Sequence, residues 1–141
     1  MRQTEAWCLR ARTGQAMLLL CAARLAVALV PFRLWRGSLG RIEGLGRSLP
    51  GPDQVRQARR LALHVERAAT RLPFATKCLP RAMALAWLLR REGLGYSCKL
   101  AVRPAMQRGT IEDLHAWIEC GDSTVLGELP GPWIVTLELR G

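Results

Sequence analysis

The stretch that most constrains this chain runs from residue 73 to 93, PFATKCLPRAMALAWLLRREG, because it predicts a helix that is apolar on every side. Ala82–Leu89 carries no polar side chain, and a helix that is apolar all round must be covered on all sides. Pro80 suits a first helical turn, and Gly93 suits the residue that ends a helix. We therefore expect one buried central helix over about Cys78–Glu92.

Cys78 stands at the expected N-terminus of this central helix. The unpaired N–H groups and the positive end of the helix dipole favour a thiolate at such a position. Cysteine is a nucleophile as the thiolate, so Cys78 is the first candidate for covalent catalysis. The other cysteines have no such placement, and we interpret them as small apolar residues of the N-terminal helices or of strands: Cys8, Cys21, Cys98 and Cys120.

Length, charge and cysteine count limit the possible classes of protein. The chain has 141 residues, half of them hydrophobic, which suits one compact domain. Its net charge of +10 comes almost entirely from arginine, and such a chain can meet nucleic acid, anionic lipid or an acidic peptide. Five cysteines without a CxxC pair or metal-ligand spacing indicate free thiols in a reducing cytoplasm, with no metal and no cofactor.

The first 52 residues form an N-terminal segment that differs from the rest of the chain. Residues 1–36 are expected to be helical, and Met17–Phe32 is the most hydrophobic run. Arg24 interrupts this run, no clear cleavage site follows it, and it is short for a transmembrane helix. We favour a helix that packs on the domain or on a partner over membrane-surface contact by residues 16–36, although flanking arginines would suit the latter. Residues 37–52 hold five glycines and two prolines and predict a linker.

Residues 53–141 predict a catalytic core of α+β class. Asp53 is expected to cap an amphipathic helix that reaches Leu72. The central helix follows, and the pattern then changes to that of an antiparallel sheet. The expected strands are Cys98–Val102, Leu114–Cys120, Thr124–Leu129 and Pro132–Leu139, with a turn at Gly121-Asp122-Ser123.

His115, in the second expected strand, is the candidate base for Cys78. A thiol nucleophile needs an imidazole to accept its proton and return it to the leaving amine. The chain has one further histidine, His64, which lies mid-helix between Leu63 and Val65 and has the pattern of an ordinary helical residue.

A third group should orient the imidazole, and three acids are candidates. In either of two hairpin registers Glu128 is expected on the face that carries His115. Asp122 lies at the turn, roughly 20 Å along the strand at about 3.3 Å per residue. Glu119 shares the strand and face of His115, four residues away. We rank Glu128 first and Asp122 as the alternative acid.

Three runs of residues together resemble a known family: PFATKCLPRAMALAWLLRREG, SCKLAVRP and LHAWIECGDSTVLGE. They resemble the transglutaminase-like leader peptidases of lasso-peptide biosynthesis, whose fold is papain-like. The family pattern is Cys-Leu-x-Arg-Ala at the start of a helix, then His-Ala-Trp-x-Glu, then an acid about a dozen residues later. The resemblance covers roughly residues 53–129, and His-Ala-Trp-x-Glu alone is shared across transglutaminase-like domains.

This resemblance implies a Cys-His-acid triad and a partner protein. Cys78 takes the place of the nucleophile and His115 that of the base. The family acid is usually Asp, and its place falls near Gly127-Glu128, so Glu128 would stand in for it. Members remove the leader from a ribosomally made precursor peptide, with a separate leader-recognition protein and, downstream, an ATP-dependent macrocyclase. The N-terminal segment and its arginines are candidates for docking that partner or an acidic leader.

Three other functions fit parts of the sequence. Acyl transfer would follow if an amine replaced water at the same site. A non-catalytic adaptor on a transglutaminase-like fold is the second, and the Glu-for-Asp difference is its support. A nucleic-acid-binding protein is the third, but the sequence shows no helix-turn-helix and no aromatic-basic platform, so we expect no nucleic-acid partner.

Overall fold

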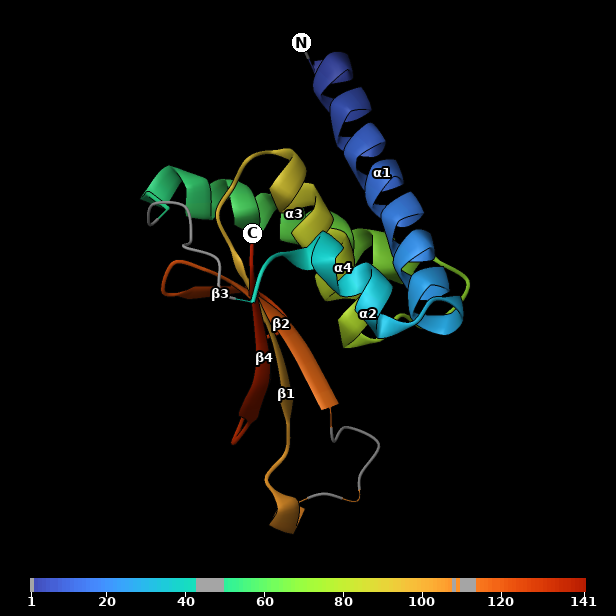
Figure 1. Ribbon diagram of the computed structural model, residues 1–141. Helices are drawn as coiled ribbons and strands as arrows, with labels where there is room; N and C mark the ends of the chain where they lie inside the picture. The colour runs from blue at the N-terminus through green and yellow to red at the C-terminus, as the bar shows by residue number, and fades with distance from the viewer. Residues whose placement is uncertain (1, 43–49, 108, 110–113) are drawn as a thin grey trace.

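Helices come first in the fold and an antiparallel sheet follows, as expected for the α+β class (Figure 1). The computed structural model describes residues 2–42, 50–107, 109 and 114–141, so residues 43–49 of the expected linker lie outside the described residues. The helices are α1 (Arg2–Leu29), α2 (Phe32–Trp35), α3 (Pro52–Arg71) and α4 (Cys78–Arg91). The strands are β1 (Ser97–Val102), β2 (Leu114–Cys120), β3 (Ser123–Leu126) and β4 (Ile134–Arg140), in the sheet order β3-β2-β1-β4.

Helix α4 is the centre of the fold, which confirms the main prediction from the sequence. It packs against α1, α3 and β2, and eight of its residues are buried. Its last turn carries Arg90, whose Nη1 donates hydrogen bonds to the carbonyl oxygens of Gly37 and Ser38. Glu92 caps the helix, and Gly93 follows with a φ of +72°, a value that favours glycine. Cys78 is therefore fixed at one end of the most buried element.

Helix α3 starts two residues earlier than expected, because Gly51 and not Asp53 is its N-cap. Gly51 is the N-cap and Pro52 occupies the first turn, where its missing N–H costs no hydrogen bond. The Asp53 carboxylate instead pairs with Arg56 one turn later. The amphipathic pattern itself is confirmed, because the buried residues of α3 all lie on the face toward the core: Ala58, Leu61, Ala62, His64, Val65, Ala68 and Ala69.

Helix α1 packs on α3 and α4 through one face. Ala16, Leu20 and Ala23 on this face are fully buried, and Arg12 forms an ion pair of 2.6 Å with Glu92 beyond the end of α4. The helix is longer than the hydrophobic run in the sequence suggested. Over Gln3–Leu29 it is long and apolar enough to cross a membrane by length and composition, so the expectation that it is too short does not hold. The division of the chain at residue 52 stays a prediction.

The β2–β3 hairpin turns at Gly121-Asp122 and then shifts its register. Cys120 pairs with Ser123 and Glu119 with Thr124, but Ile118 pairs with Leu126, so β3 contains a bulge. The strand ends there instead of continuing to residue 129. Strand β1 agrees with the prediction to within one residue and pairs with both β2 and β4. β4 begins two residues later than expected.

Candidate functional site

Cys78 is the first residue of α4 and is half-buried. Lys77 is the N-cap, and its side chain makes no capping hydrogen bond. The N–H groups of the first turn therefore have no side-chain acceptor at the cap. Pro80 has no N–H, which leaves the Cys78 and Leu79 amides as the donors beside the thiol. These amides point toward the positive end of the helix, where an anion is stabilised.

Cys78 of α4 and His115 of β2 line the same cavity, although 37 positions separate them in the sequence. This cavity has a volume of about 350 Å³ and lies where α4 packs on β2. Its other lining residues come from α3, from the loop before α4, from α4, and from β2, β3 and the segment after it: Glu66, Thr76, Arg81, Ala116, Leu126, Gly127, Glu128 and Leu129. We call it the Cys78 cavity below.

His115 is held by the main chain of the segment after β3. Its side chain is buried, and Nε2 lies 2.6 Å from the carbonyl oxygen of Gly127. A carbonyl oxygen can only accept, so Nε2 carries the proton and Nδ1 keeps its lone pair. The ring also lies beside Trp117 and Trp133, with centroid separations of 5.6 and 5.1 Å. The imidazole is thus fixed in the tautomer in which Nδ1 can act as a base.

Gly127 reaches this position because of its own backbone conformation. Its φ is +83°, and a Cβ there would lie 2.9 Å from the carbonyl oxygen of Ala116 and 3.1 Å from Trp117 Cβ. Only glycine combines this conformation with such a close approach to β2. The bulge in β3 and Gly127 together bring a carbonyl oxygen, and not a carboxylate, to His115.

Glu128 lies beside His115 without bonding to it. It lines the Cys78 cavity and also a neighbouring cavity of about 200 Å³ that it shares with His115, Trp117 and Trp133. Its side chain is exposed, and within the described residues it forms no hydrogen bond or ion pair. The direct pairing of His115 with Glu128 expected from one register is not formed, because the bulge shifts the strand and pairing ends at Leu126.

The two other acids lie in different surroundings. Asp122 is exposed in the hairpin turn and does not belong to the lining of either cavity around His115. Glu119 has its oxygens engaged: Lys99 Nζ lies 2.8 Å from Oε2, and Trp117 Nε1 donates to Oε1 at 2.9 Å. Glu119 lines the 200 Å³ cavity beside His115 but not the Cys78 cavity, so Glu128 is the one of the three candidate acids that lines the Cys78 cavity.

Sequence reasoning missed a polar cluster at the wall of the Cys78 cavity. Arg81 Nε donates to Thr76 Oγ1 at 3.0 Å, and Arg81 Nη1 lies 3.1 Å from Glu66 Oε2. Arg81 follows Cys78 by three positions, which places both on one face of α4. That spacing was the available signal, whereas the contacts with α3 and with the loop before α4 required the fold. The cluster ties this loop to two helices and so fixes the approach to Cys78.

Two of the remaining cysteines are buried and two lie on α1, where Cys8 shares a separate cavity with His64. Burial raises the pKa of the Cys98 thiol to about 12 and also raises the pKa of the Cys120 thiol, whose Sγ donates to the carbonyl oxygen of Gly95. Cys8 is exposed and Cys21 is half-buried on α1. Cys78 is the one thiol that shares a cavity with His115 among the described residues.

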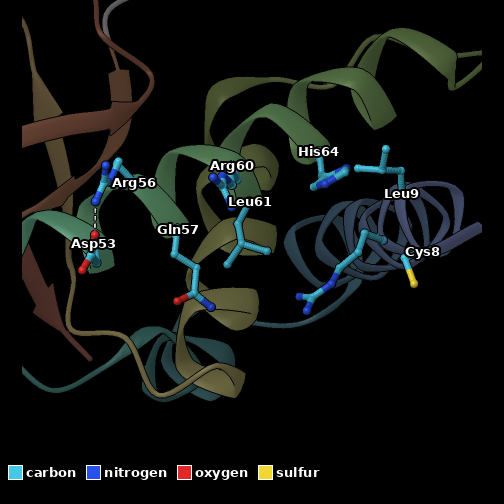
Figure 2. Close-up of a pocket in the computed structure, with 9 residues that line it drawn as sticks. Cys8, Leu9, Asp53, Arg56, Gln57, Arg60, Leu61 and His64 are labelled. Atoms are coloured by element: carbon cyan, nitrogen blue, oxygen red, sulfur yellow. Dashed lines mark hydrogen bonds and ion pairs between the residues drawn. The ribbon is translucent and has the colours of Figure 1, made fainter. Parts of the chain in front are cut away.

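His64 lies in a second cavity, between α1 and α3, that contains neither Cys78 nor His115 (Figure 2). This cavity of about 630 Å³ is lined partly by arginines, namely Arg12, Arg56 and Arg60. His64 Nδ1 lies 3.1 Å from the buried Thr13 Oγ1. Burial, followed by the charges of Arg67 and Arg12, lowers the pKa of His64. We find a neutral structural histidine there, as the sequence indicated.

Comparison with known families decides the class of this protein. The model of the transglutaminase-like superfamily matches residues 26–133, more than half of the chain, and the match includes Cys78, His115 and Glu128. The chain belongs to the transglutaminase-like superfamily. Proteins of this superfamily are typically cysteine proteases or acyltransferases. No curated protein and no solved structure matches the chain significantly.

The groups that line the Cys78 cavity of this transglutaminase-like domain suit the chemistry of a thiol nucleophile. Within the described residues no group of three or more His, Cys, Asp or Glu side chains is arranged to hold a metal ion. The cavity instead offers a thiol at a helix N-terminus, an imidazole with a free Nδ1, and main-chain amides. These groups are the ones that acyl transfer through a thioester requires.

Proposed function

We propose that this transglutaminase-like protein is a cysteine peptidase that removes the leader from a ribosomally made lasso-peptide precursor. The shared cavity of Cys78 and His115 is the observation that carries the proposal. The resemblance of residues 53–129 to lasso-peptide leader peptidases supplies the substrate class. We assign Cys78 as nucleophile, His115 as base and Glu128 as the acid of the site, with Asp122 as the alternative.

In the first half of the reaction, Cys78 attacks the carbonyl carbon at the junction of leader and core. His115 Nδ1 accepts the thiol proton, and the N–H groups of Cys78 and Leu79 stabilise the developing oxyanion. The tetrahedral intermediate then collapses, the C–N bond breaks, and Nδ1 returns the proton to the leaving amine of the core peptide. The leader remains attached to Cys78 as a thioester.

In the second half, water replaces the departed core peptide. His115 Nδ1 takes a proton from this water as it attacks the thioester carbonyl, and the C–S bond breaks. The products are the leader with a free carboxylate and the regenerated Cys78 thiol. Throughout, the Gly127 carbonyl holds Nε2–H, and the nearby Glu128 carboxylate favours the imidazolium that forms transiently.

The same proposal implies two partners in a cytoplasmic pathway. A separate leader-recognition protein would present the precursor, and an ATP-dependent macrocyclase would close the ring on the freed amine. The excess of arginine over acidic residues in residues 1–52 suits an acidic leader or an acidic face of such a partner. The peptidase step itself needs no cofactor in this scheme.

Mass spectrometry of a precursor peptide, incubated with this protein and its leader-recognition protein, tests the proposal. We expect cleavage at one junction, loss of cleavage in Cys78→Ala, and a loss on the order of 10³-fold in His115→Ala. Cys8→Ala is the matched control, because Cys8 is exposed on α1 and lies outside the Cys78 cavity. Cleavage that persists in Cys78→Ala would contradict the proposal.

Cleavage in water enriched in ¹⁸O separates hydrolysis from acyl transfer. Hydrolysis places one ¹⁸O atom in the new leader carboxylate, because water breaks the thioester. A leader joined to an amine, without ¹⁸O, would assign the site to acyl transfer instead. A folded wild-type protein that binds the partner but leaves the precursor intact would favour the adaptor.

A further inference from the structure

The outer face of α1 is apolar and exposed along most of its length. Trp7, Leu18, Leu25 and Leu29 follow one another at intervals of 11, 7 and 4 residues, close to whole numbers of helical turns. We call these four residues the outer stripe. Leu18, Leu25 and Leu29 are 74, 58 and 76% exposed, respectively. Large apolar side chains gathered in this way on one helix indicate a surface that meets something apolar.

The opposite face of the same helix is part of the domain core. Leu20 is fully buried, and it lies two residues from Leu18, which places the two side chains on opposite sides of α1. Figure 1 shows α1 as the outermost helix, with α3 and α4 between it and the sheet. Crossing a membrane would remove Ala16, Leu20 and Ala23 from this core, so α1 can lie on an apolar phase but not span it without unpacking.

The charges around the outer stripe show which apolar phase suits it. Every exposed residue between Ala11 and Val30 is apolar except Arg24, which stacks on Phe74 at 4.1 Å. The sequence from residue 6 to 42 contains six arginines and no acidic residue. Protein interfaces generally have a polar rim, whereas an anionic bilayer needs only apolar insertion and a cationic border.

The segment after α1 completes this border. Phe32 and Leu34 of α2 are 41 and 67% exposed. Arg33 and Arg36 beside them are exposed, and no acidic side chain in the described part of the chain pairs with either. Arginine next to exposed leucine and phenylalanine is the pattern of a helix that lies in the interface of a bilayer containing anionic lipid.

We propose that the outer stripe of α1, with Phe32 and Leu34 of α2, binds the surface of anionic membranes. The leucine side chains enter the boundary between headgroups and acyl chains, and Arg33 and Arg36 bind lipid phosphates. A second copy of this chain is a poorer occupant, because it would bring another charge of +10 to a border that is already cationic. The Cys78 cavity lies between α4 and the sheet, so membrane binding leaves it open to substrate.

Flotation with lipid vesicles tests this proposal on the full chain. We expect binding to phosphatidylcholine vesicles that contain phosphatidylglycerol, weak binding to phosphatidylcholine alone, and weaker binding as salt rises. Leu25→Glu with Leu29→Glu should lower the partition coefficient at least about 100-fold. Arg33→Gln with Arg36→Gln should lower it about 30-fold on anionic vesicles, since each near-surface arginine contributes roughly a factor of five.

Leu63→Glu is the matched control, because Leu63 is 55% exposed on α3 and lies outside the outer stripe. It should leave the partition coefficient unchanged, and all variants should keep the wild-type circular dichroism spectrum. Binding that Leu25→Glu with Leu29→Glu leaves intact would overturn the proposal. The absence of vesicle binding by the wild type would also overturn it. A wild-type dimer in light scattering that Leu25→Glu with Leu29→Glu converts to a monomer, without vesicle binding, would assign the outer stripe to a contact between two copies of the chain instead.

Discussion

Replacement of Gly127 by alanine tests how the His115 acceptor is placed. The left-handed conformation at φ +83° costs alanine roughly 1–2 kcal/mol. A Cβ would also lie 2.9 Å from the Ala116 carbonyl oxygen, which belongs to the backbone of β2 and cannot move freely. Overpacking of this kind adds about 1–3 kcal/mol, so the free energy of unfolding should fall by about 2–5 kcal/mol.

Gly121→Ala isolates the steric part of this loss. Gly121 also has a positive φ, +62°, but among the described residues a Cβ there would meet the Pro50 ring alone, with Cγ at 3.4 Å and Cδ at 3.9 Å. The free energy of unfolding of Gly121→Ala should therefore fall by the conformational cost alone, roughly 1–2 kcal/mol. For a chain of this size 1 kcal/mol corresponds to about 4 °C in Tm, so Gly127→Ala should melt at least about 4 °C below Gly121→Ala in differential scanning calorimetry.

Catalysis gives Gly127→Ala a second readout. Displacement of the carbonyl removes the acceptor of His115 Nε2–H, and we expect precursor cleavage to slow about tenfold, for a loss of about 1.4 kcal/mol in the barrier. Gly121→Ala should cleave at the wild-type rate when both are assayed well below their Tm. Equal Tm losses in the two variants, with equal cleavage rates, would refute the reasoning that Gly127 is pressed against β2 to hold His115.

Three further predictions concern other parts of the structure. Arg81→Met should lower the free energy of unfolding by about 1–3 kcal/mol in urea titration, because Thr76 and Glu66 lose their shared partner, while Arg59→Met on the exposed face of α3 should have little effect. The pKa of His64 is lowered in the fold, so the unfolded state binds its proton first; stability should fall as pH drops below about 6.5, and His64→Gln should reduce this slope. Iodoacetamide should modify Cys78 and the exposed Cys8 in the native protein at neutral pH, and peptide mapping should find Cys98 unmodified, since burial raises its pKa to about 12; rapid labelling of Cys98 would contradict its place in the core.

The central helix could be predicted because several independent signals agree over one short stretch. Pro80, the apolar run and Gly93 mark its start, interior and end, and the structure places α4 within one residue of the predicted end. Strands β1 and β2 were predicted for a similar reason, since their alternation is regular and β2 agrees with the prediction at both ends. These elements can be predicted from the sequence because their local signals agree with one another.

The bulge in β3 could not be predicted from alternation. Ser123–Leu126 offers no residue type that specifies an extra position, and one inserted residue reverses which side chains face His115. Gly127 was visible in the sequence, but its φ and its approach to Ala116 depend on the neighbouring strand. The exposure of the outer stripe is similar, because hydropathy alone does not distinguish the face of α1 that packs on α3 from the face that does not.

Trapping the thioester tests whether Cys78 is the nucleophile of the reaction. Precursor, leader-recognition protein and this protein are mixed, quenched in acid after a fraction of one turnover, and the protein is digested and analysed by mass spectrometry. We expect the leader attached to the peptide that contains Cys78, no adduct in Cys78→Ala, and slower formation of the adduct in His115→Ala. Cleavage of the precursor with the adduct on another cysteine, or undiminished in Cys78→Ala, would contradict this role of Cys78.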